Sequence, residues 1–420
     1  MASEWKEARL ADLMDVKHGF AFSGENIRDE PPGDILLTPG NFAIGGGFKG
    51  DKFKYFDGEV PEDYVLTEGE LVVTMTDLSK QADTLGYPAI VPKSHGPRFL
   101  HNQRLGKILI KSGADLDKIF LFYLLRIAEY RHEVLASATG TTVKHTSPTR
   151  ILAFETSIPP LAEQKAIAAI LGSLDDKIEL NRRMNATLEA MARALFQSWF
   201  VDFDPVRAKL DGRVPVGMDA ETAALFPAGF DESALGHIPL GWQLGRFGDL
   251  CNLKRGHDLP SSTRKVGLIP VISSSGISGM HSETSVRGPG VVTGRYGTIG
   301  KVFFVETDYW PLNTTLYVED FKKNPPRFIF HALGEVNFSN YTDKAAVPGV
   351  NRNHLHEEPT VISSMEVRQA FAHIVELLWT KHAANCAQSR TLATLRDTLL
   401  PKLLSGELSV AQTAKELSAP

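Results

Sequence analysis

The sequence predicts an α/β (α+β) fold in which two globular domains are joined and spaced by two long coiled-coil helices, related by a pseudo-twofold internal duplication. Three observations predict it. An amphipathic stretch begins with prolines at mid-chain, a second stretch of the same pattern follows 204 residues later, and short β-branched runs alternate with amphipathic segments before each of them. With 420 residues, 43% hydrophobic and 23% charged, the chain is long enough for two or three folded domains.

The first long helix is predicted at residues 158–200 and begins with IPPLAEQKAIAAIL. Proline suits a first helical turn because the N–H that it lacks has no helical partner there. Steps of four and three residues then follow an apolar seam for about five heptads. The seam consists of Ile167, Leu171, Leu174, Ile178, Asn181, Asn185, Leu188, Ala192, Leu195 and Trp199. We expect Asp204–Pro205 to stop this helix.

The second long helix, within residues 361–410, repeats the first with no gap. Its seam consists of Phe371, Val375, Leu378, His382, Asn385, Ser389, Leu392, Arg396, Leu399 and Leu403. An asparagine recurs at one seam position, Asn181 in the first helix and Asn385 in the second. A buried polar residue at such a position fixes the register of a coiled coil. We therefore predict that these asparagines lie within side-chain hydrogen-bonding reach, or one water, of each other; the alternative is that both are solvated on the outer face.

The segments before the helices repeat as well. WKEARLADLMDVKHG (5–19) matches WQLGRFGDLCNLKRG (242–256), and HNQRL (101–105) matches LNTTL (312–316). These matches place globular domains at 1–157 and 241–360, an acidic Gly- and Pro-containing linker at 201–240, and a tail at 411–420. Within the domains, ELVVTM, KILIK, GVVTG and KVFFV are typical of strands, and DKIFLFYLLRIAEYR and RFIFHALGEV of helices.

The charge balance limits the ways in which this chain could bind nucleic acid. Its net charge is −5; residues 1–157 carry 18 Lys and Arg against 22 Asp and Glu, and residues 241–360 carry 13 against 11. A protein of this balance cannot bind DNA mainly as a phosphate clamp, so a partner would have to supply that charge.

Location and metal content can also be predicted. The charged start lacks the apolar run of a signal peptide, and no uninterrupted apolar stretch of about 18 residues is present, so we expect a cytoplasmic protein without membrane contact. Cys251 and Cys386 lie far apart without neighbouring metal ligands, which predicts neither a disulfide nor a zinc site.

Three stretches that superficially suggest catalysis lack a necessary part. KNPPRF (323–328) has Arg327 where an amino-methyltransferase loop needs an aromatic residue to stack on the flipped base. GRYGTIGK (294–301) lacks the Ser or Thr that follows the lysine of a phosphate loop, and NFAIGGGF (41–48) lacks a strand–loop–helix context. We interpret these glycines as turn residues and predict that the chain is not itself a catalyst.

The combination of IPPLAEQKAIAAIL, LFQSWFVDFDPVRAKLDGR, FPAGFDESALGHIPLGW and LRDTLLPKLLSGEL resembles the DNA-specificity subunits of Type I restriction–modification systems, which serve phage defence. The second helix start, ISSM (362–365), departs from the proline-containing start common in that family. The resemblance implies two target recognition domains that read a bipartite, asymmetric site on double-stranded DNA, and two long helices that pack antiparallel as the spacer between them. It implies two methyltransferase (modification) subunits and restriction/translocase subunits as partners. S-adenosylmethionine, ATP and Mg would be bound by those partners, which methylate adenine and cleave DNA, and no cofactor by this chain.

Base edges are read by donors and acceptors on exposed loops, and the polar loops of each domain supply candidates. In the first domain these are Lys17, His18, His101, Asn102, Gln103, Arg104, Thr141, Thr142, Lys144 and His145; in the second, Lys254, Arg255, His257, Arg295, Tyr296, Asn351, Arg352, Asn353 and His354. Asn102 and its counterpart Asn313 occupy equivalent places, which favours a structural role for both. Candidates that differ between the copies, such as Gln103, Lys144, Asn351 and Arg352, are favoured as readers.

Two alternatives remain open at this point. The chain could serve another restriction architecture, in which nuclease and methyltransferase are fused in one partner. It could also be a duplicated coiled-coil scaffold with no role on DNA, which would show no sequence-specific DNA binding in the presence of methyltransferase.

Overall fold

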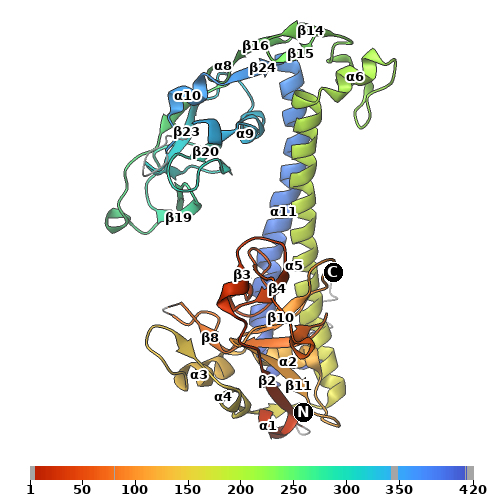
Figure 1. Cartoon of the computed structure of the whole chain (residues 1–420), viewed down its shortest axis with the longest axis vertical. Helices are drawn as coiled ribbons and strands as arrows, with labels where there is room; N and C mark the ends of the chain where they lie inside the picture. The colour runs from red at the N-terminus through yellow and green to blue at the C-terminus, as the bar shows by residue number, and fades with distance from the viewer. Residues whose placement is uncertain (1–4, 80, 342–348, 412, 414–420) are drawn as a thin grey trace. The chain divides into compact units, whose positions relative to one another are not determined.

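A computed structural model describes residues 5–79, 81–341, 349–411 and 413. The chain forms two compact units (Figure 1): unit 1 comprises Met1–Leu180 and Gln388–Pro420, and unit 2 comprises Asn181–Ala387. Both units mix helices with mainly antiparallel sheets, as the predicted fold class requires. Within the described residues, no helix is long and apolar enough to cross a membrane.

The main sheet of unit 1 has four antiparallel strands in the order β2-β11-β7-β9. Its strands are β2 (Met14–His18), β7 (Leu71–Thr74), β9 (Pro88–Ile90) and β11 (Leu105–Ile110). Around it lie the helices α1 (Leu10–Leu13), α2 (Lys118–Leu124), α3 (Ala128–Ala136) and α4 (Pro148–Leu152) and the short antiparallel pairs β1–β13 (Lys6–Arg9 with Glu155–Ile158) and β8–β12 (Thr76–Asp77 with Lys144–His145). β7 is buried on both faces: Leu71 and Val73 lie in the main core of the unit with Ile108 of β11, and Val72 lies in a core of the second sheet with Leu105 of β11.

A second, five-stranded sheet extends unit 1, in the order β3-β5-β4-β10-β6. Its strands are β3 (Ile27–Arg28), β4 (Asp34–Leu37), β5 (Lys54–Phe56), β6 (Val65–Leu66) and β10 (Phe99–His101). Phe22 and Phe56 pack edge to face, with ring centroids 4.8 Å apart, in one of the two small cores of this sheet.

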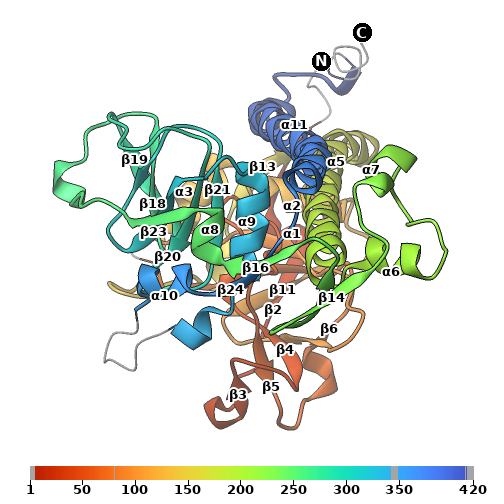
Figure 2. The ribbon, with the colours of Figure 1, turned by 90° about the horizontal axis from the view of Figure 1, so that it is seen from above.

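The main sheet of unit 2 has the order β17-β23-β20-β21. Its strands are β17 (Asn252–Arg255), β20 (Gly290–Gly294), β21 (Val302–Val305) and β23 (Thr315–Asp320); a three-stranded sheet, β19-β18-β22, is formed by β18 (Ile269–Ser273), β19 (Gly276–His281) and β22 (Trp310–Pro311). The remaining elements are α6 (Asp204–Leu210), α7 (Ala220–Ala224), the hairpin β14–β15 (Phe230–Ser233 with Gly236–Pro239), the pair β16–β24 (Gln243–Arg246 with Pro359–Ile362), α8 (Phe247–Leu250), α9 (Pro326–Gly334) and α10 (Arg352–His356). Figure 2 shows α9 between the main sheet of unit 2 and the long helices.

The two units share one topology. In each, a strand pairs with the segment that leads into a long helix (β1–β13, β16–β24), a four-residue helix follows (α1, α8), and the next strand is the edge of the four-stranded sheet. Even a local detail recurs: the backbone N–H of Arg9 donates to Asp12, and that of Arg246 to Asp249. This correspondence supports the predicted duplication, with a three-stranded second sheet in unit 2 where unit 1 has five strands.

The two long helices are α5 (Leu161–Phe196) and α11 (Met365–Leu404). Contacts in unit 2 join later residues of α5 to earlier residues of α11, as expected for an antiparallel pair: Asn185 meets Asn385, and Glu189 meets His382. Every seam position predicted from the sequence is buried or half-buried.

The helix ends follow from their local sequences. The Pro160 carbonyl accepts the N–H groups of Glu163 and Gln164 at the start of α5. The start of α11 needs no proline, because the Ser364 hydroxyl accepts the Val367 N–H at 3.4 Å. After Phe196 the chain forms a π-helical turn, Gln197–Val201, and then adopts a left-handed conformation at Phe203. Pro205 therefore lies in the first turn of a new helix, α6, and the break itself falls before Asp204.

The short elements agree with the predicted patterns. The four predicted strands are β7, β11, β20 and β21, and RFIFHALGEV contains α9. One prediction was too simple: DKIFLFYLLRIAEYR contains two helices, α2 and α3, because the chain bends at Leu125–Ile127, where Arg126 and Ile127 close short turns onto Tyr123 and Leu124.

Candidate nucleic-acid interface

Three separate segments of unit 2 meet around one hollow of about 470 Å³. Lys254 and Arg255 end β17, Arg295 and Tyr296 follow β20, and the segment from Gly349 leads into α10. Six residues proposed from the sequence line this hollow: Lys254, Arg255, Arg295, Tyr296, Asn351 and Arg352. Asn353 is exposed on the first turn of α10, and His257 is half-buried beyond the end of β17.

Backbone hydrogen bonds hold this hollow in place. The N–H groups of Arg295 and Tyr296 donate to the Thr314 carbonyl at 2.8 and 3.2 Å, and the Val350 N–H donates to the Arg295 carbonyl at 3.0 Å. Tyr296 also forms a bridge with Gly349. A Cβ atom on Gly349 would lie 2.2 Å from the Tyr296 ring, so this close approach requires glycine.

The basic side chains around the hollow differ in how far their charges are compensated. Lys254 forms an ion pair with Glu319, and this hydrogen bond raises the pKa of the lysine. Arg255 lies 4.0 Å from Asp258. Within the described ranges, no carboxylate forms an ion pair with Arg295 or with Arg352. The Arg352 Nη1 lies 3.5 Å from the Leu253 carbonyl. The Arg295 guanidinium lies over the Tyr296 ring, 4.6 Å from its centroid.

Asn351 has a structural task in addition to any role on DNA. Its side-chain oxygen accepts the Asn353 N–H at 3.0 Å and caps α10. The same position in unit 1 is Ser147, whose hydroxyl caps α4 by accepting the Arg150 N–H. A difference between the copies at this position therefore reflects two alternative caps as well as two candidate readers.

In unit 1 the predicted residues lie on the corresponding segments. Lys17 and His18 end β2, Gln103 and Arg104 form the turn between β10 and β11, and Thr142, Lys144 and His145 lie in and before β12. Met75 joins two of these segments: its N–H donates to the Arg104 carbonyl at 2.8 Å, and its carbonyl accepts the Thr146 N–H at 3.0 Å. All except Lys17 and Lys144, which are half-buried, are exposed.

Some predicted residues of unit 1 are already engaged within the protein. The Lys17 ammonium donates to the Asp63 carbonyl at 2.9 Å and lies 4.7 Å from the centre of the Tyr64 ring. The His145 Nδ1 lies 3.2 Å from the Thr76 hydroxyl. Their remaining surface is what a ligand could meet.

The structure corrects the sequence-based proposal that His101 contacts a base. It is fully buried, its Nε2 contacts the Leu105 carbonyl at 3.0 Å, and burial lowers its pKa to about 4. It supports the turn and cannot reach a base edge. Its neighbour Asn102 is also buried, and its side-chain oxygen accepts the Arg104 N–H.

Two of the stretches that superficially suggested catalysis have structural roles: one contributes a buried side chain, and the other forms a turn. Arg327 of KNPPRF is buried between the rings of Phe304 and Trp379 and pairs with Glu376. Gly45, Gly46 and Gly47 all have positive φ, as turn glycines do. Among the described residues, no group of three or more His, Cys, Asp or Glu is placed to hold a metal ion.

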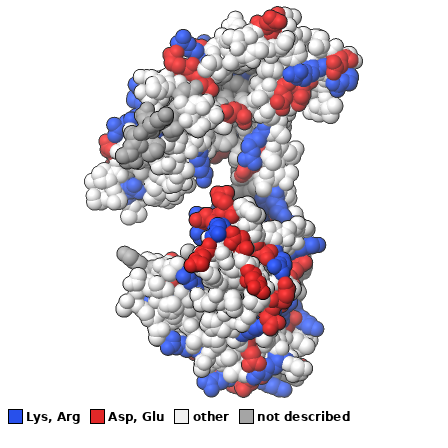
Figure 3. All heavy atoms as spheres, in the orientation of Figure 1, with Lys and Arg blue, Asp and Glu red and all other residues white. Residues whose placement is uncertain are grey.

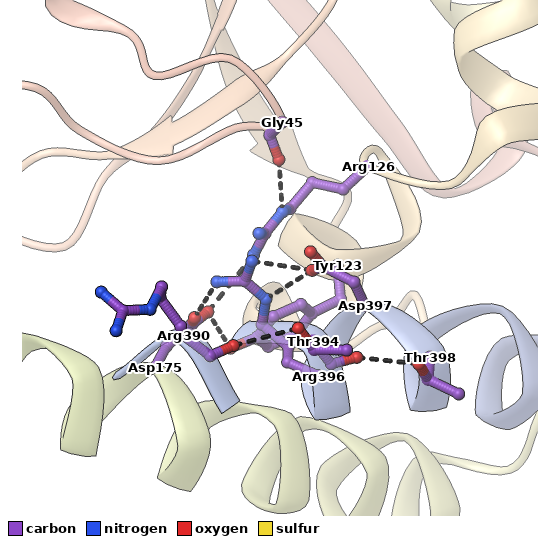
Figure 4. A network of polar contacts seen from close by, with 9 residues as sticks. All are labelled: Gly45, Tyr123, Arg126, Asp175, Arg390, Thr394, Arg396, Asp397 and Thr398. Atoms are coloured by element: carbon purple, nitrogen blue, oxygen red, sulfur yellow. Dashed lines mark hydrogen bonds and ion pairs between the residues drawn. The ribbon is translucent and has the colours of Figure 1, made fainter. Parts of the chain in front are cut away.

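A polar network that the sequence analysis missed anchors the globular part of unit 1 to the long helices (Figure 4). Asp175 of α5 accepts hydrogen bonds from Tyr123 at 2.7 Å, Arg126 at 3.3 Å and Arg396 of α11 at 2.5 Å. Arg126 continues the network to the Gly45 carbonyl at 2.7 Å. Burial, followed by the neighbouring Asp175 carboxylate, raises the pKa of Tyr123 far above its usual value.

The sequence did contain a signal for this network. Arg396 occupies a predicted seam position, and a charged side chain there requires a charged partner when it is buried. Burial is the largest single influence and lowers the pKa of Arg396, but the hydrogen bonds that Arg396 donates to Asp175 and Asp397, together with the charges of both carboxylates, outweigh it and raise the pKa. The first long helix has a carboxylate directly beside its seam: Asp175 follows the seam residue Leu174. This position would have indicated Asp175 as a partner for Arg396.

The coil asparagines lie together, as predicted. Asn181 and Asn385 are 1% and 2% exposed, and the Asn181 Nδ2 lies 3.4 Å from the Asn385 carbonyl. The solvated alternative is therefore wrong. The partner of the Asn385 side chain is Asn185, whose Oδ1 accepts its Nδ2 at 2.9 Å, and the Asn185 amide in turn contacts the Cys386 sulfur. The polar layer is thus broader than the predicted pair.

Comparisons with known proteins agree with the predicted family. Residues 2–190 match the family model described as Type I restriction modification DNA specificity domain. The chain is 27% identical over 355 residues to the Type I restriction enzyme HindI specificity subunit of Haemophilus influenzae, covering 69% of this chain and 77% of that protein. It is 23% identical over 359 residues to the MjaIX specificity subunit of Methanocaldococcus jannaschii, covering 78% and 76%.

The fold also has a solved counterpart. The crystal structure of a Type I restriction–modification system S subunit from M. genitalium aligns with a TM-score of 0.53 at 18% identity, covering 96% of each chain. At this identity the likeness concerns the fold.

Proposed function

We propose that this chain, which belongs to the family of Type I restriction–modification specificity subunits, reads a bipartite, asymmetric DNA target with one half-site for each unit and recruits methyltransferase subunits to it. Recognition of DNA sequence is the general property of the family. The division of the target between the two units and the recruitment of partners are the proposal.

One observation carries it: the two units present different side chains on the same backbone arrangement. The pairing of Thr76 with His145 corresponds to the bridge between Tyr296 and Gly349. One neighbouring hydrogen bond is matched as well: the Thr146 N–H donates to Met75, and the Val350 N–H donates to Arg295. Unit 2 has one residue more, Gly294, between Arg295 and Thr293, which pairs with Leu316 as Thr74 pairs with Leu105. The pairs that result are Met75 and Arg295, Thr76 and Tyr296, His145 and Gly349, Thr146 and Val350, and Ser147 and Asn351. Met75, Thr76, Thr146 and Val350 are buried, so the accessible side chains that differ are His145 and Ser147 in unit 1 and Arg295, Tyr296 and Asn351 in unit 2.

Such a pattern suits two readers of different sequences. The backbone bonds fix where a side chain begins, and the side chain decides which donors and acceptors meet a base edge. Because the two sets differ in charge and in size, the half-sites that they read should differ as well, which makes the whole target asymmetric.

The charge distribution supports a need for partners. Figure 3 shows acidic and basic side chains interspersed over the visible face of each unit. Counting all residues, 1–157 carry an excess of acidic groups and 241–360 an excess of only two basic groups. Phosphate contacts normally supply most of the affinity for DNA, so we propose that methyltransferase subunits provide them. Those subunits would also bind S-adenosylmethionine, and restriction subunits would bind ATP and Mg.

The test is to co-express the chain with its methyltransferase subunit in a methylation-free host and to map methylated adenines. We expect a two-part motif with an unspecified spacer. Exchange of residues 1–157 for those of another family member should then replace one half of the motif and preserve the other. Methylation without a two-part motif, or an exchange that altered both halves, would overturn the proposal.

A further inference from the structure

The hollow of unit 2 contains two arginines whose charges are not compensated by described neighbours. Four cationic side chains line it, and the two nearest to carboxylates are Lys254 and Arg255. Arg295 and Arg352 remain, with no described acidic group within ion-pair distance. An arginine pair kept uncompensated in one concave site is typical of a surface that binds an anionic or acceptor-rich ligand.

We propose that Arg295 reads a guanine in the half-site of unit 2 and that Arg352 contacts the adjoining phosphate. This inference rests on the proposed function, since it requires that unit 2 meets DNA. Arginine that donates two hydrogen bonds to guanine O6 and N7 is the commonest base-specific contact in the major groove. The assignment therefore predicts a G·C pair at a required position of that half-site.

Arg295 is the better base reader because its backbone is held on both sides and its side chain has a ring partner. Its N–H and its carbonyl are hydrogen-bonded to Thr314 and Val350. Its guanidinium lies over the Tyr296 ring, 4.6 Å from the ring centroid, and a cation–π contact of this kind limits the freedom of the side chain before it binds. A two-pronged contact with a base then costs less conformational entropy.

Arg352 suits a phosphate instead. It lies on the first turn of α10, its side chain is exposed, and its one described polar contact, with the Leu253 carbonyl, is 3.5 Å long. An exposed cation that no described carboxylate holds can meet a phosphate without a fixed orientation.

Unit 1 lacks both groups at the corresponding places. The counterpart of Arg295 is Met75, which is 2% exposed, and the residue after the Ser147 cap is Pro148, where unit 2 has Arg352 after Asn351. The arginine-based reading is therefore specific to unit 2, and the half-site of unit 1 should not depend on it.

The experiment compares variants of the full chain in complex with methyltransferase, on duplexes in which the G·C pair is kept or replaced by A·T. The wild-type complex should prefer the G·C duplex by roughly 10- to 100-fold in Kd, and R295A should lose that preference. R295K keeps one positive charge but not the two-pronged donor, so it should retain binding with a weakened preference. R352A should weaken both duplexes alike and reduce the salt dependence by about one counterion. Arg287→Ala, an exposed arginine outside the hollow, is the matched control and should change neither.

The outcomes separate this inference from the proposed function. If a two-part motif is found but the unit 2 half-site has no required G·C pair, or R295A retains the preference for it, the reading by Arg295 is wrong while the specificity function stands. If no two-part motif is found, the proposed function itself fails. A loss for R295A that is equal on both duplexes and largely restored by R295K would assign Arg295 to a phosphate, because that contact needs the charge and not the two-pronged donor, and would also overturn the inference.

Discussion

The two units attach their globular parts to the long helices by different chemistry at equivalent positions. In unit 1 the anchor is polar, with Asp175 accepting hydrogen bonds from Tyr123, Arg126 and Arg396. The position 204 residues later is Trp379, which packs against Phe330 of α9 and lies under the Arg327 guanidinium. The comparison teaches that the two units share a topology and a helix seam, while the contacts that hold each globular part on the helices differ.

The anchor of unit 2 is largely aromatic. The Phe371 ring lies within 5.3 to 6.4 Å, centroid to centroid, of Phe196, Phe200, Trp199, Phe328 and His331. Such clusters gain most of their stability from the burial of large apolar surfaces, with a smaller contribution from ring geometry. We therefore expect the stability of unit 2 to fall most when a buried ring is removed, and that of unit 1 to fall most when a charge of its anchor is removed.

The first prediction removes the centre of the aromatic anchor. Phe371→Ala should lower the free energy of unfolding of unit 2 by about 3–5 kcal/mol, because the ring is fully buried and its loss leaves a cavity. Hydrogen exchange of α9 should accelerate while that of α2 stays unchanged. Faster exchange in both helices to the same degree would contradict separate anchors.

The second prediction removes the charge of the polar anchor. Asp175→Asn leaves Arg126 and Arg396 without their carboxylate, and loss of one partner of a buried pair costs about 3–5 kcal/mol. Because the Asp175 side chain is 29% exposed, we expect a value at or below the lower end, about 2–3 kcal/mol, confined to unit 1. The neighbouring exposed residue Asp176 provides the control, and Asp176→Asn should change the unfolding free energy of unit 1 by less than about 0.5 kcal/mol.

The third prediction concerns acid. Burial, with smaller contributions from Arg327 and Arg193, lowers the pKa of His331 in the aromatic anchor to about 4, against about 6.5 when unfolded. The unfolded state then binds more protons between these values, so the contribution of neutral His331 is complete above pH 6.5 and is lost as the pH falls toward 4. The loss is at most about 1.4 kcal/mol per pH unit, or about 2 kcal/mol between pH 6.5 and 5.

His331→Phe should flatten this dependence for unit 2 without altering unit 1. Unit 1 has its own buried histidine with a lowered pKa, His101, which lies outside the polar anchor. Its pH dependence should therefore persist in the His331 variant when denaturant unfolding is followed by hydrogen exchange in each unit. A slope that disappeared from both units would show that they unfold together.

These contrasts also mark how far the sequence could be interpreted. The period of the seams predicted both long helices, since one face of α5 and of α11 is buried along its length. The apolar runs GVVTG and KILIK predicted strands of the two main sheets; KILIK alternates between more and less buried residues, and GVVTG is buried throughout. The local sequence pattern is sufficient to predict a helix or a strand where burial of its apolar residues determines the structure.

Contacts between segments far apart in the chain were not predictable in this way. Nothing near Asp175 in the sequence indicates Tyr123 or Arg126, and nothing near Met75 indicates that it lies between Arg104 and Thr146. Residue type indicated polar loops, whereas only the fold shows that six of the proposed residues of unit 2 share one hollow and that His101 is buried.

The smallest net effect is expected for a double variant in the polar layer of the coil within unit 2. The Asn385 side chain donates to Asn185, and both residues are at most 9% exposed. Asn385→Leu alone should cost about 1–3 kcal/mol, because it leaves the buried Asn185 oxygen without that donor. Replacement of both asparagines by leucine should give a stability within about 1 kcal/mol of the wild type, since paired apolar groups need no hydrogen bonds.

If the layer fixes the register, the double variant should keep its stability but show more than one helix pairing, which cysteine cross-linking across α5 and α11 would detect. If the double variant shows one helix pairing only, the asparagines do not fix the register, and the register would be fixed by the anchors at the helix ends.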